Sequence, residues 1–387
     1  MSSLRMLGAT ALAFALAVPS AHADPGVTPD AIAFAQVAAL DGPAGALGVG
    51  MRDGIVAAFE EANRAGGVHG RMLTLDSFDD GYEPDRAVAE VNAVIEGAKH
   101  FGLIGSVGTP TSKATQPTAT AAGMPFIGAF TGAGFLRDPA LKNVWNLRAS
   151  YAAETEAWIA HLVDGLGMKS IAILYQDDGF GRVGLDGVEA AMTRRGMALA
   201  ATGSYTRNTV AVKSALLAIK RAEPDAVVMV GAYKPIAEFI KLSRKVKLDA
   251  TFVNISFVGS KALAAELGPD GEGVIISQVV PFPWDASVPA VADYQAAIQA
   301  VKADAAPSFV SLEGYLAGRM TIAALDAAGP ALTRASFLAA FETMTDLDLG
   351  GVEVKFAPGD NQGLDAVYLT RINADGSFGP VTLGSGS

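Results

Sequence analysis

The feature that most constrains this chain is a regular alternation of short apolar runs with amphipathic stretches. Runs such as Ile171-Ala172-Ile173-Leu174 and Val227-Val228-Met229-Val230 are continuously apolar, which is typical of parallel strands covered on both faces. The stretch 46–64 has the period of a helix, because its large apolar residues return on one face. Strands separated by helices predict βαβ units in doubly wound α/β sheets.

The expected elements follow this alternation. The predicted strands are residues 31–40, 72–78, 101–107, 125–130, 144–148, 170–175, 199–204, 226–231, 251–256 and 273–280. The predicted helices are residues 46–64, 85–95, 155–166, 182–194, 210–222 and 236–246, followed by a long helical region at 291–344. Turn signals at 358–361 and 374–377 predict hairpins in the tail.

The pattern restarts near Tyr151, and the 387 residues exceed what one hydrophobic core usually holds. We therefore expect two α/β lobes. Ligands of such sheets bind at the carboxyl ends of the strands, so a cleft between the lobes is the expected site.

The first 23 residues have the layout of a secretory signal peptide. Arg5 precedes an apolar run from Leu7 to Val18, and the small-residue triplet Ala21-His22-Ala23 follows. The run is too short to span a bilayer. A buried helix is the alternative, although the chain turns at once to Asp24-Pro25-Gly26. We expect cleavage after Ala23, export to the periplasm and no stable membrane insertion.

Composition argues against several classes of function. The formal net charge is −11 and no Lys/Arg cluster stands out, so nucleic acid is not an expected partner. With no Cys and four scattered His, we expect no metal site. The loop 42–48 has a loose G-x-x-G-x-x-G pattern whose first spacing does not fit a dinucleotide site, so no cofactor is expected. Common hydrolase motifs are also missing, which argues against an enzyme.

Three segments after predicted strands are rich in Gly, Ser and Thr: residues 41–48, 105–115 and 128–134. Glycine lets a ligand approach the backbone, and helix N-termini favour anions. The hydroxyls of Thr109, Thr111, Ser112 and Thr131 would add donors for a carboxylate. The alternative is that these residues only cap helices and form turns, but two such segments on neighbouring strands favour binding.

Two further strand ends carry candidate residues. After the sixth strand come Asp177 and Asp178, and helix capping is the favoured role for one of them. Phe180 follows closely and could face the cleft. Tyr233 occupies the matching position after the next strand, where its ring and hydroxyl could both contact a ligand.

Taken together, several blocks resemble one family. They are residues 61–70 (Glu-Ala-Asn-Arg-Ala-Gly-Gly-Val-His-Gly), Asp79-Asp80 with Pro84, Thr115-Gln116-Pro117, Asn146-Leu147-Arg148-Ala149 and Asp178-Gly179-Phe180-Gly181. In this order they resemble the periplasmic leucine/isoleucine/valine-binding proteins, the solute receptors of ABC transporters. The resemblance implies a type I periplasmic binding fold whose two lobes close on a ligand about a hinge. It places the crossovers near 149, 280 and 350, so that residues 24–148 plus 281–349 form lobe 1 and residues 149–280 plus 350–387 form lobe 2.

The resemblance also implies roles for residues. Ser112, or Thr111 or Thr109 in its place, would bind the ligand carboxylate together with the segment Phe130, Thr131 and Gly132. Tyr151, Phe180 and Tyr233 would shape the side-chain pocket. The family has an acidic partner for the ligand ammonium after the strand 251–255, where this chain has Ser256-Phe257. Either Glu154 replaces that acid or the ligand lacks an α-amino group.

The expected function is that of a monomeric periplasmic receptor without a covalent step. It would deliver a small carboxylate or amino acid to a membrane ABC permease. A ligand-sensing module for a signalling receptor is the alternative, and an exported α/β enzyme is a third possibility.

Overall fold

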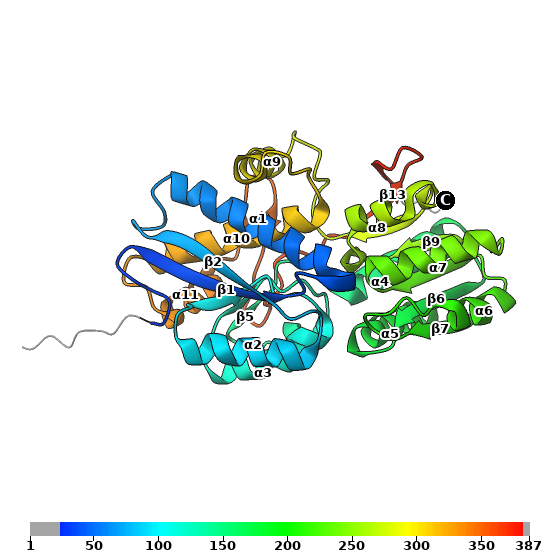
Figure 1. Cartoon of the computed structure of the whole chain (residues 1–387), viewed down its shortest axis with the longest axis horizontal. Helices are drawn as coiled ribbons and strands as arrows, with labels where there is room; N and C mark the ends of the chain where they lie inside the picture. Colours follow the sequence, from blue (N-terminus) through cyan, green and yellow to red (C-terminus); the bar gives the residue numbers. More distant parts are fainter. Residues whose placement is uncertain (1–23, 382–387) are drawn as a thin grey trace, which may run out of the picture.

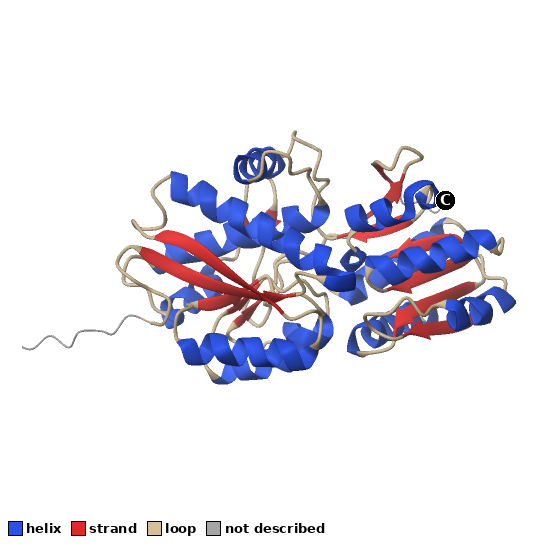
Figure 2. Cartoon of the chain, viewed as in Figure 1, coloured by secondary structure: helices blue, strands red, loops and turns tan. Residues whose placement is uncertain are grey.

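The computed structural model describes residues 24–381. The predicted signal peptide, residues 1–23, lies outside the described residues, as do residues 382–387. Two lobes lie side by side along the long axis, each built on a twisted sheet with helices on both faces (Figures 1 and 2). The doubly wound α/β class is therefore confirmed, and every predicted strand is present, although β3, β4 and β5 are shorter than expected.

The first lobe contains a wholly parallel sheet in the order β2-β1-β3-β4-β5. Its strands are β1 (Ala31–Ala38), β2 (Met72–Asp79), β3 (Gly102–Ile104), β4 (Phe126–Ile127) and β5 (Val144–Trp145). Side chains of β1 alternate between the faces, as strand geometry requires. Phe34 belongs to the core on one face, and Ala35 and Val37 belong to the core on the other.

Helices cover both faces of this sheet. They are α1 (Gly45–Arg64), α2 (Pro84–Gly97), α3 (Thr109–Ala121), α9 (Pro289–Val301), α10 (Phe309–Ala328) and α11 (Arg334–Thr343). The last three divide the long helical region predicted at 291–344. Helices α1, α9, α10 and α11 cover one face, and α2 and α3 cover the other (Figure 1). At Gly54, α1 and α10 meet closely, because a Cβ there would lie 1.9 Å from the carbonyl oxygen of Ser311.

The second lobe contains a sheet in the order β14-β13-β10-β9-β8-β6-β7. Its strands are β6 (Ile171–Gln176), β7 (Ala201–Tyr205), β8 (Ala226–Val230), β9 (Thr251–Asn254), β10 (Ile275–Gln278), β13 (Tyr368–Ile372) and β14 (Phe378–Pro380). Its helices are α4 (Tyr151–Ile159), continued by a π-helical turn at Ala160–Gly165, α5 (Gly179–Thr193), α6 (Lys213–Arg221), α7 (Tyr233–Lys245) and α8 (Ser260–Leu267). Strands β6 to β10 are parallel, and the predicted hairpin β13–β14 is added in antiparallel pairing.

The chain passes between the sheets after β5, after β10 and before β13. The third passage lies after Leu364, later than the expected position near 350. The segment from β11 (Leu347–Asp348) and β12 (Glu353–Val354) to Leu364 stays with the first lobe, where Val352, Val354, Phe356 and Leu364 are buried in its core. Backbone bonds also pair residues 361–364 with Asn146 and Leu147 beside β5.

The two lobes contact each other along the carboxyl ends of their parallel strands. One hydrophobic cluster includes the core of the second lobe together with Ala38, Leu47, Tyr82, Val107 and Phe130 of the first. The residues at this junction are therefore shielded from solvent on both sides. No helix in residues 24–381 is both long enough and apolar enough to cross a membrane.

Candidate functional site

Helix α3 presents its first turn to the junction. The segment 105–115, for which no helix was predicted, becomes helical at Thr109 because Pro110 suits the first turn and Gly108 takes a φ of 104° before it. The Thr111 hydroxyl donates to the carbonyl of Val107 at 2.5 Å, so it is engaged within the helix start. Ser112 Oγ is fully buried and has no hydrogen-bond partner among the described residues, and the same holds for Ser106 Oγ before the helix.

The segment after β4 lies beside this helix start. Thr131 Oγ1 and Thr109 Oγ1 are 2.6 Å apart and share a hydrogen bond. The Gly132 carbonyl accepts the Tyr151 N–H at 2.8 Å, and a Cβ at Gly132 would lie 2.5 Å from the Tyr151 ring. Tyr151 opens α4, and its hydroxyl is buried without a hydrogen-bond partner in the described chain. Buried polar atoms are normally satisfied, so these hydroxyls are available to a ligand.

Arg148 forms the centre of a buried charged cluster at the first passage between the lobes. Its guanidinium lies 4.5 Å from the Phe130 ring centroid and 5.8 Å from that of Tyr151. Its Nε is 3.3 Å from Glu313 Oε1, and its Nη2 donates to Ser256 Oγ. Nη1 has no hydrogen-bond partner in residues 24–381. The residue therefore links α10 of the first lobe to the strand ends of the second.

Glu154 belongs to the same cluster. Its Oε2 accepts the Ser256 N–H at 2.9 Å and the Ser277 hydroxyl at 2.5 Å, and its Oε1 accepts the Ser256 hydroxyl at 2.9 Å. Arg148 Nη2 is 4.0 Å from Oε1. Ser256, which follows β9, thus holds the buried Glu154 in place, and both carboxylate oxygens of Glu154 already accept hydrogen bonds.

Burial sets the ionisation of this cluster. Burial raises the pKa of Glu313 to about 7, with Arg148 opposing the rise and Glu154 adding to it. Burial lowers the pKa of Arg148, but the carboxylates of Glu313 and Glu154 more than compensate, so the net shift is upward. Burial and the nearby Arg148 lower the pKa of Arg137 to about 10. The guanidinium of Arg148 therefore stays charged at neutral pH.

Aromatic rings fill the space between the lobes. Phe257, directly after Ser256, lies with its ring centroid 4.6 Å from Phe180, 5.3 Å from Phe130 and 5.9 Å from Tyr82. Phe180 also lies 5.5 Å from Tyr151. Phe130 and Tyr82 come from the first lobe and Phe180 and Phe257 from the second, so the rings contact one another across the junction.

Polar contacts join the lobes at the edge of this aromatic cluster. Glu83, before α2, accepts Arg207 Nη2 at 2.8 Å and Asn208 Nδ2 at 2.7 Å from the loop after β7. Asp178 caps α5 as predicted, and it also accepts Arg207 Nη1 at 2.9 Å. Tyr233 Oη accepts the Ala46 N–H at 3.4 Å, away from the rings described above. The contacts of Glu83 with Arg207 and Asn208, and the contact of Tyr233 with Ala46, exist only while the lobes lie together, whereas Asp178 and Arg207 both belong to the second lobe.

The structure brings most of the predicted site residues to one place. Ser112, Thr109, Phe130, Thr131, Gly132, Tyr151, Glu154, Phe180 and Ser256 are all buried along the junction. Thr111 also lies at the junction, but its hydroxyl is bonded to the backbone carbonyl of Val107. Tyr233 lies apart from these residues, beside the start of α1. The sequence did not single out Arg148, Glu313 or Tyr82 as site residues. Arg148 lies in the Asn-Leu-Arg-Ala block that resembles the family, and this block was the one feature of the sequence that could have identified it. No local pattern indicates a role for Glu313.

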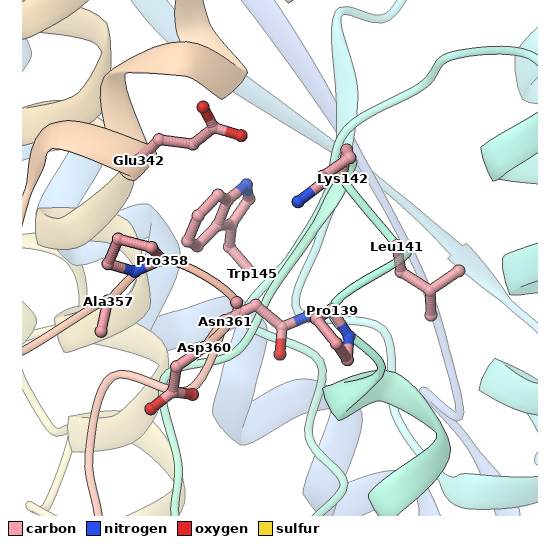
Figure 3. Close-up of a pocket in the computed structure, with 10 residues that line it drawn as sticks. Pro139, Leu141, Lys142, Trp145, Glu342, Ala357, Pro358, Asp360 and Asn361 are labelled. Atoms are coloured by element: carbon pink, nitrogen blue, oxygen red, sulfur yellow. The ribbon is translucent and has the colours of Figure 1, made fainter.

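A separate hollow of about 250 Å³ lies at the opposite end of β5, and none of the predicted site residues lines it (Figure 3). It is lined by Pro139, Leu141, Lys142, Trp145, Glu342, Ala357, Pro358, Gly359, Asp360 and Asn361. Its charged residues are exposed and of both signs, so it lacks the convergent buried donors of the junction. Residues 24–381 also contain no cluster of three His, Cys, Asp or Glu placed to hold a metal ion.

Comparison with known proteins agrees with this architecture. The model of a family described as periplasmic binding protein matches residues 31–377. A Leu/Ile/Val-binding protein homologue of Brucella melitensis is 27% identical over 197 residues, covering 49% of each chain. The chain thus spans about half the length of the first curated relatives it matches. A Leu/Ile/Val-binding protein of Rhizobium johnstonii is 25% identical over 334 residues, covering 85% of this chain and 86% of that protein.

Solved structures show the same fold. A possible leucine/isoleucine/valine-binding protein from Rhodopirellula baltica is 35% identical, with a TM-score of 0.88 over 92% of this chain and 98% of its own. A solute-binding protein of an R. palustris ABC transporter, crystallised with benzoate, shares the fold at 18% identity and a TM-score of 0.81, over 92% and 96% of the two chains. These proteins are binding proteins and not enzymes. With its two sheets, its three passages and a junction of buried donors and rings, the chain belongs to the periplasmic binding protein family, among the type I members that include the Leu/Ile/Val-binding proteins.

Proposed function

We propose that this protein is the periplasmic solute receptor of an ABC importer. It captures a small carboxylate-bearing or amino-acid-like solute between its lobes and delivers it to a membrane permease. The observation that carries the proposal is the set of buried hydroxyls of Ser106, Ser112 and Tyr151, which lie at the junction without a partner in the described chain. Such groups lose free energy unless something accepts their hydrogen bonds.

The surroundings of these hydroxyls favour an anion. The first turn of α3 presents its helix N-terminus there, and the Arg148 guanidinium lies on the adjoining ring of Phe130. The relatives named for leucine, isoleucine and valine bind carboxylate-bearing solutes, as does the distant neighbour crystallised with benzoate.

Closure about the three passages supports capture and release. Glu83, Arg207 and Asn208 hold the lobes together through exposed or half-buried polar contacts, which break at modest cost when the lobes separate. We propose that the mature chain begins at Asp24 after signal cleavage and acts as a monomer.

The test begins with the solute that accompanies the protein. The chain from Asp24 is purified, unfolded to release its solute, and refolded, and the solute is identified by mass spectrometry. Titration of that solute should give saturable heat and a smaller radius of gyration in X-ray scattering. A chain that releases no solute, and whose radius stays constant with every carboxylate tried, would refute the proposed function.

A pair of serine variants then locates the site. Ser112→Ala should weaken solute binding by about tenfold with little change in stability, because this hydroxyl makes no internal hydrogen bond. Ser243→Ala is the matched control, since Ser243 is equally buried but bonds the Phe239 carbonyl within α7. Unchanged affinity in Ser112→Ala would remove Ser112 from the site.

A further inference from the structure

We propose that the junction between the lobes binds a carboxylate that carries no α-ammonium group, and that the ring of Phe257 contacts the hydrocarbon or aromatic body of that solute. The inference rests on the proposed function and names the class of solute. It follows from three observations: the state of the buried carboxylates, the position of the Arg148 charge, and the chemistry of the groups left without partners.

The first observation is that the acids nearest the rings are already occupied. Both oxygens of Glu154 accept bonds from Ser256 and Ser277. Asp178 bonds the backbone N–H of Phe180, Gln176 and Arg207. An ammonium group needs a charged or strongly polar partner when it leaves water, and these carboxylates would have to break existing bonds to provide one.

Glu313 and Asp80 are the remaining buried acids of this region. Glu313 is the counter-ion of Arg148, and taking it away would leave that guanidinium uncompensated. Asp80 Oδ1 accepts the Tyr82 N–H at 2.7 Å, while its Oδ2 has no partner in the described chain. Asp80 is therefore the one acid that could still compete for an ammonium group, and the experiment includes it.

The second observation is that the Phe130 and Tyr151 rings already face one cation. Aromatic faces can attract a cation, and the Phe130 and Tyr151 faces already hold the guanidinium of Arg148. A second cation in the same cluster would be repelled by the first across a buried, weakly screened distance. Phe257 contacts Phe130 and Phe180 with its own ring, so the segment after β9 offers an apolar surface to the solute and no charge.

The third observation is the excess of donors. Arg148 Nη1 and the hydroxyls of Ser106, Ser112 and Tyr151 are buried without partners in residues 24–381. These four donors can bind the oxygens of a carboxylate. Against them stands one free acid oxygen, Asp80 Oδ2, so the site suits an anion better than the two opposite charges of an amino acid. The apolar rings suit a hydrocarbon or aromatic body attached to that carboxylate.

The experiment compares matched pairs by calorimetry on the refolded chain from Asp24. The pairs are phenylalanine with 3-phenylpropanoate and leucine with 4-methylpentanoate, which differ only in the ammonium group. We expect the desamino acid of a pair to bind at least about 100-fold more tightly, because the ammonium would be buried without a free partner. Amino acids that bind as tightly or more tightly would overturn the inference and leave the proposed function standing.

Variants test whether Phe257 contacts the body of the solute. Phe257→Leu should lower the affinity for 3-phenylpropanoate by up to about tenfold and that for 4-methylpentanoate less, since only the former loses ring contacts. Phe252→Leu is the control, because Phe252 lies within β9 and packs against Phe239. Equal losses for both solutes, or equal losses in both variants, would overturn the role of Phe257. If Phe257→Leu does not fold, the paired titrations of the unaltered protein still decide the solute class.

Three further outcomes complete the test. Amino-acid binding that is abolished by Asp80→Asn would show Asp80 to be the ammonium partner and overturn the inference. If neither pair binds, the solute released from the native protein decides: one with an α-ammonium group overturns the inference, and a carboxylate without one supports it. If no solute of any kind closes the lobes, the proposed function fails as well.

Discussion

Asp80 should make the protein less stable as the pH rises from about 4 to about 7. Its side chain is fully buried at the end of β2, and one carboxylate oxygen has no partner in the described chain. Burial raises its pKa from 3.8 to about 7; the Tyr82 N–H opposes the rise and the neighbouring Asp79 adds to it. Between these two values the folded protein holds a proton that the unfolded chain has released, so the free energy of unfolding falls as the pH increases.

The size of this loss of stability follows from the pKa shift of Asp80. About three pKa units at 1.36 kcal/mol each give a cost of up to about 4 kcal/mol, absent below pH 4 and fully present above pH 8. Asp80→Asn removes the ionisation and keeps an oxygen for the Tyr82 N–H. Relative to the unaltered protein, the variant should therefore gain stability steadily between pH 4 and pH 8.

Urea unfolding of both proteins at half-unit steps from pH 4 to pH 8 measures this difference. Asp186→Asn, an exposed aspartate on α5, is the control and should show no comparable trend. A stability difference between Asp80→Asn and the unaltered protein that is the same at pH 5 and pH 8 would show that Asp80 ionises normally, and the reasoning from burial would be wrong.

Three other substitutions test the packing and the closure. Glu83→Gln removes a carboxylate that joins the lobes. Bound solute should therefore dissociate about twofold to fivefold faster in stopped-flow measurements, with a smaller effect at high salt. An unchanged rate would exclude Glu83 from holding the lobes closed. Gly54→Ala should lower the free energy of unfolding by about 1–3 kcal/mol, because its Cβ would collide with the Ser311 carbonyl; a stable variant in urea would mean that α1 and α10 can separate. Arg148→Met should lower the free energy of unfolding by about 3–5 kcal/mol at pH 8, because it leaves the buried carboxylates of Glu154 and Glu313 without their counter-ion. The loss should be smaller at pH 5, where Glu313 takes up a proton. Equal losses at both pH values would contradict the assignment of this cluster.

Most of the fold could be predicted because its signals are local. A continuously apolar run such as 227–230 indicates a strand buried on both faces, and β8 lies in the middle of its sheet. Helix α3 was less visible, because its first turn is rich in Thr, Ser and Pro, which also form loops. The third passage between the lobes was misplaced because residues 352–364 are held in the first lobe by tertiary contacts that no local pattern reports. Phe356 packs against Trp145, far away in sequence, and against Phe341 of α11.

The site was predictable only in part for the same reason. Ser112 and Thr131 could be found because each follows a strand, and parallel strands bring their ends together. The partnership of Glu154 with Ser256 and Ser277 joins three separate elements, and no local pattern reports it. Arg148 lies in a recognisable block, but its burial between Glu313 and Phe130 depends on how the two lobes meet.

The antiparallel strand β13 has a consequence for how the protein matures. It pairs with β10 from Ile275 opposite Arg371 to Gln278 opposite Tyr368, so the second sheet keeps an open edge until the last stretch of the chain has been synthesised. A nascent chain that ends before β13 leaves this edge unpaired and lacks Leu369 and Ile372, which are buried in the second core. The second lobe therefore cannot complete its packing until synthesis is nearly finished.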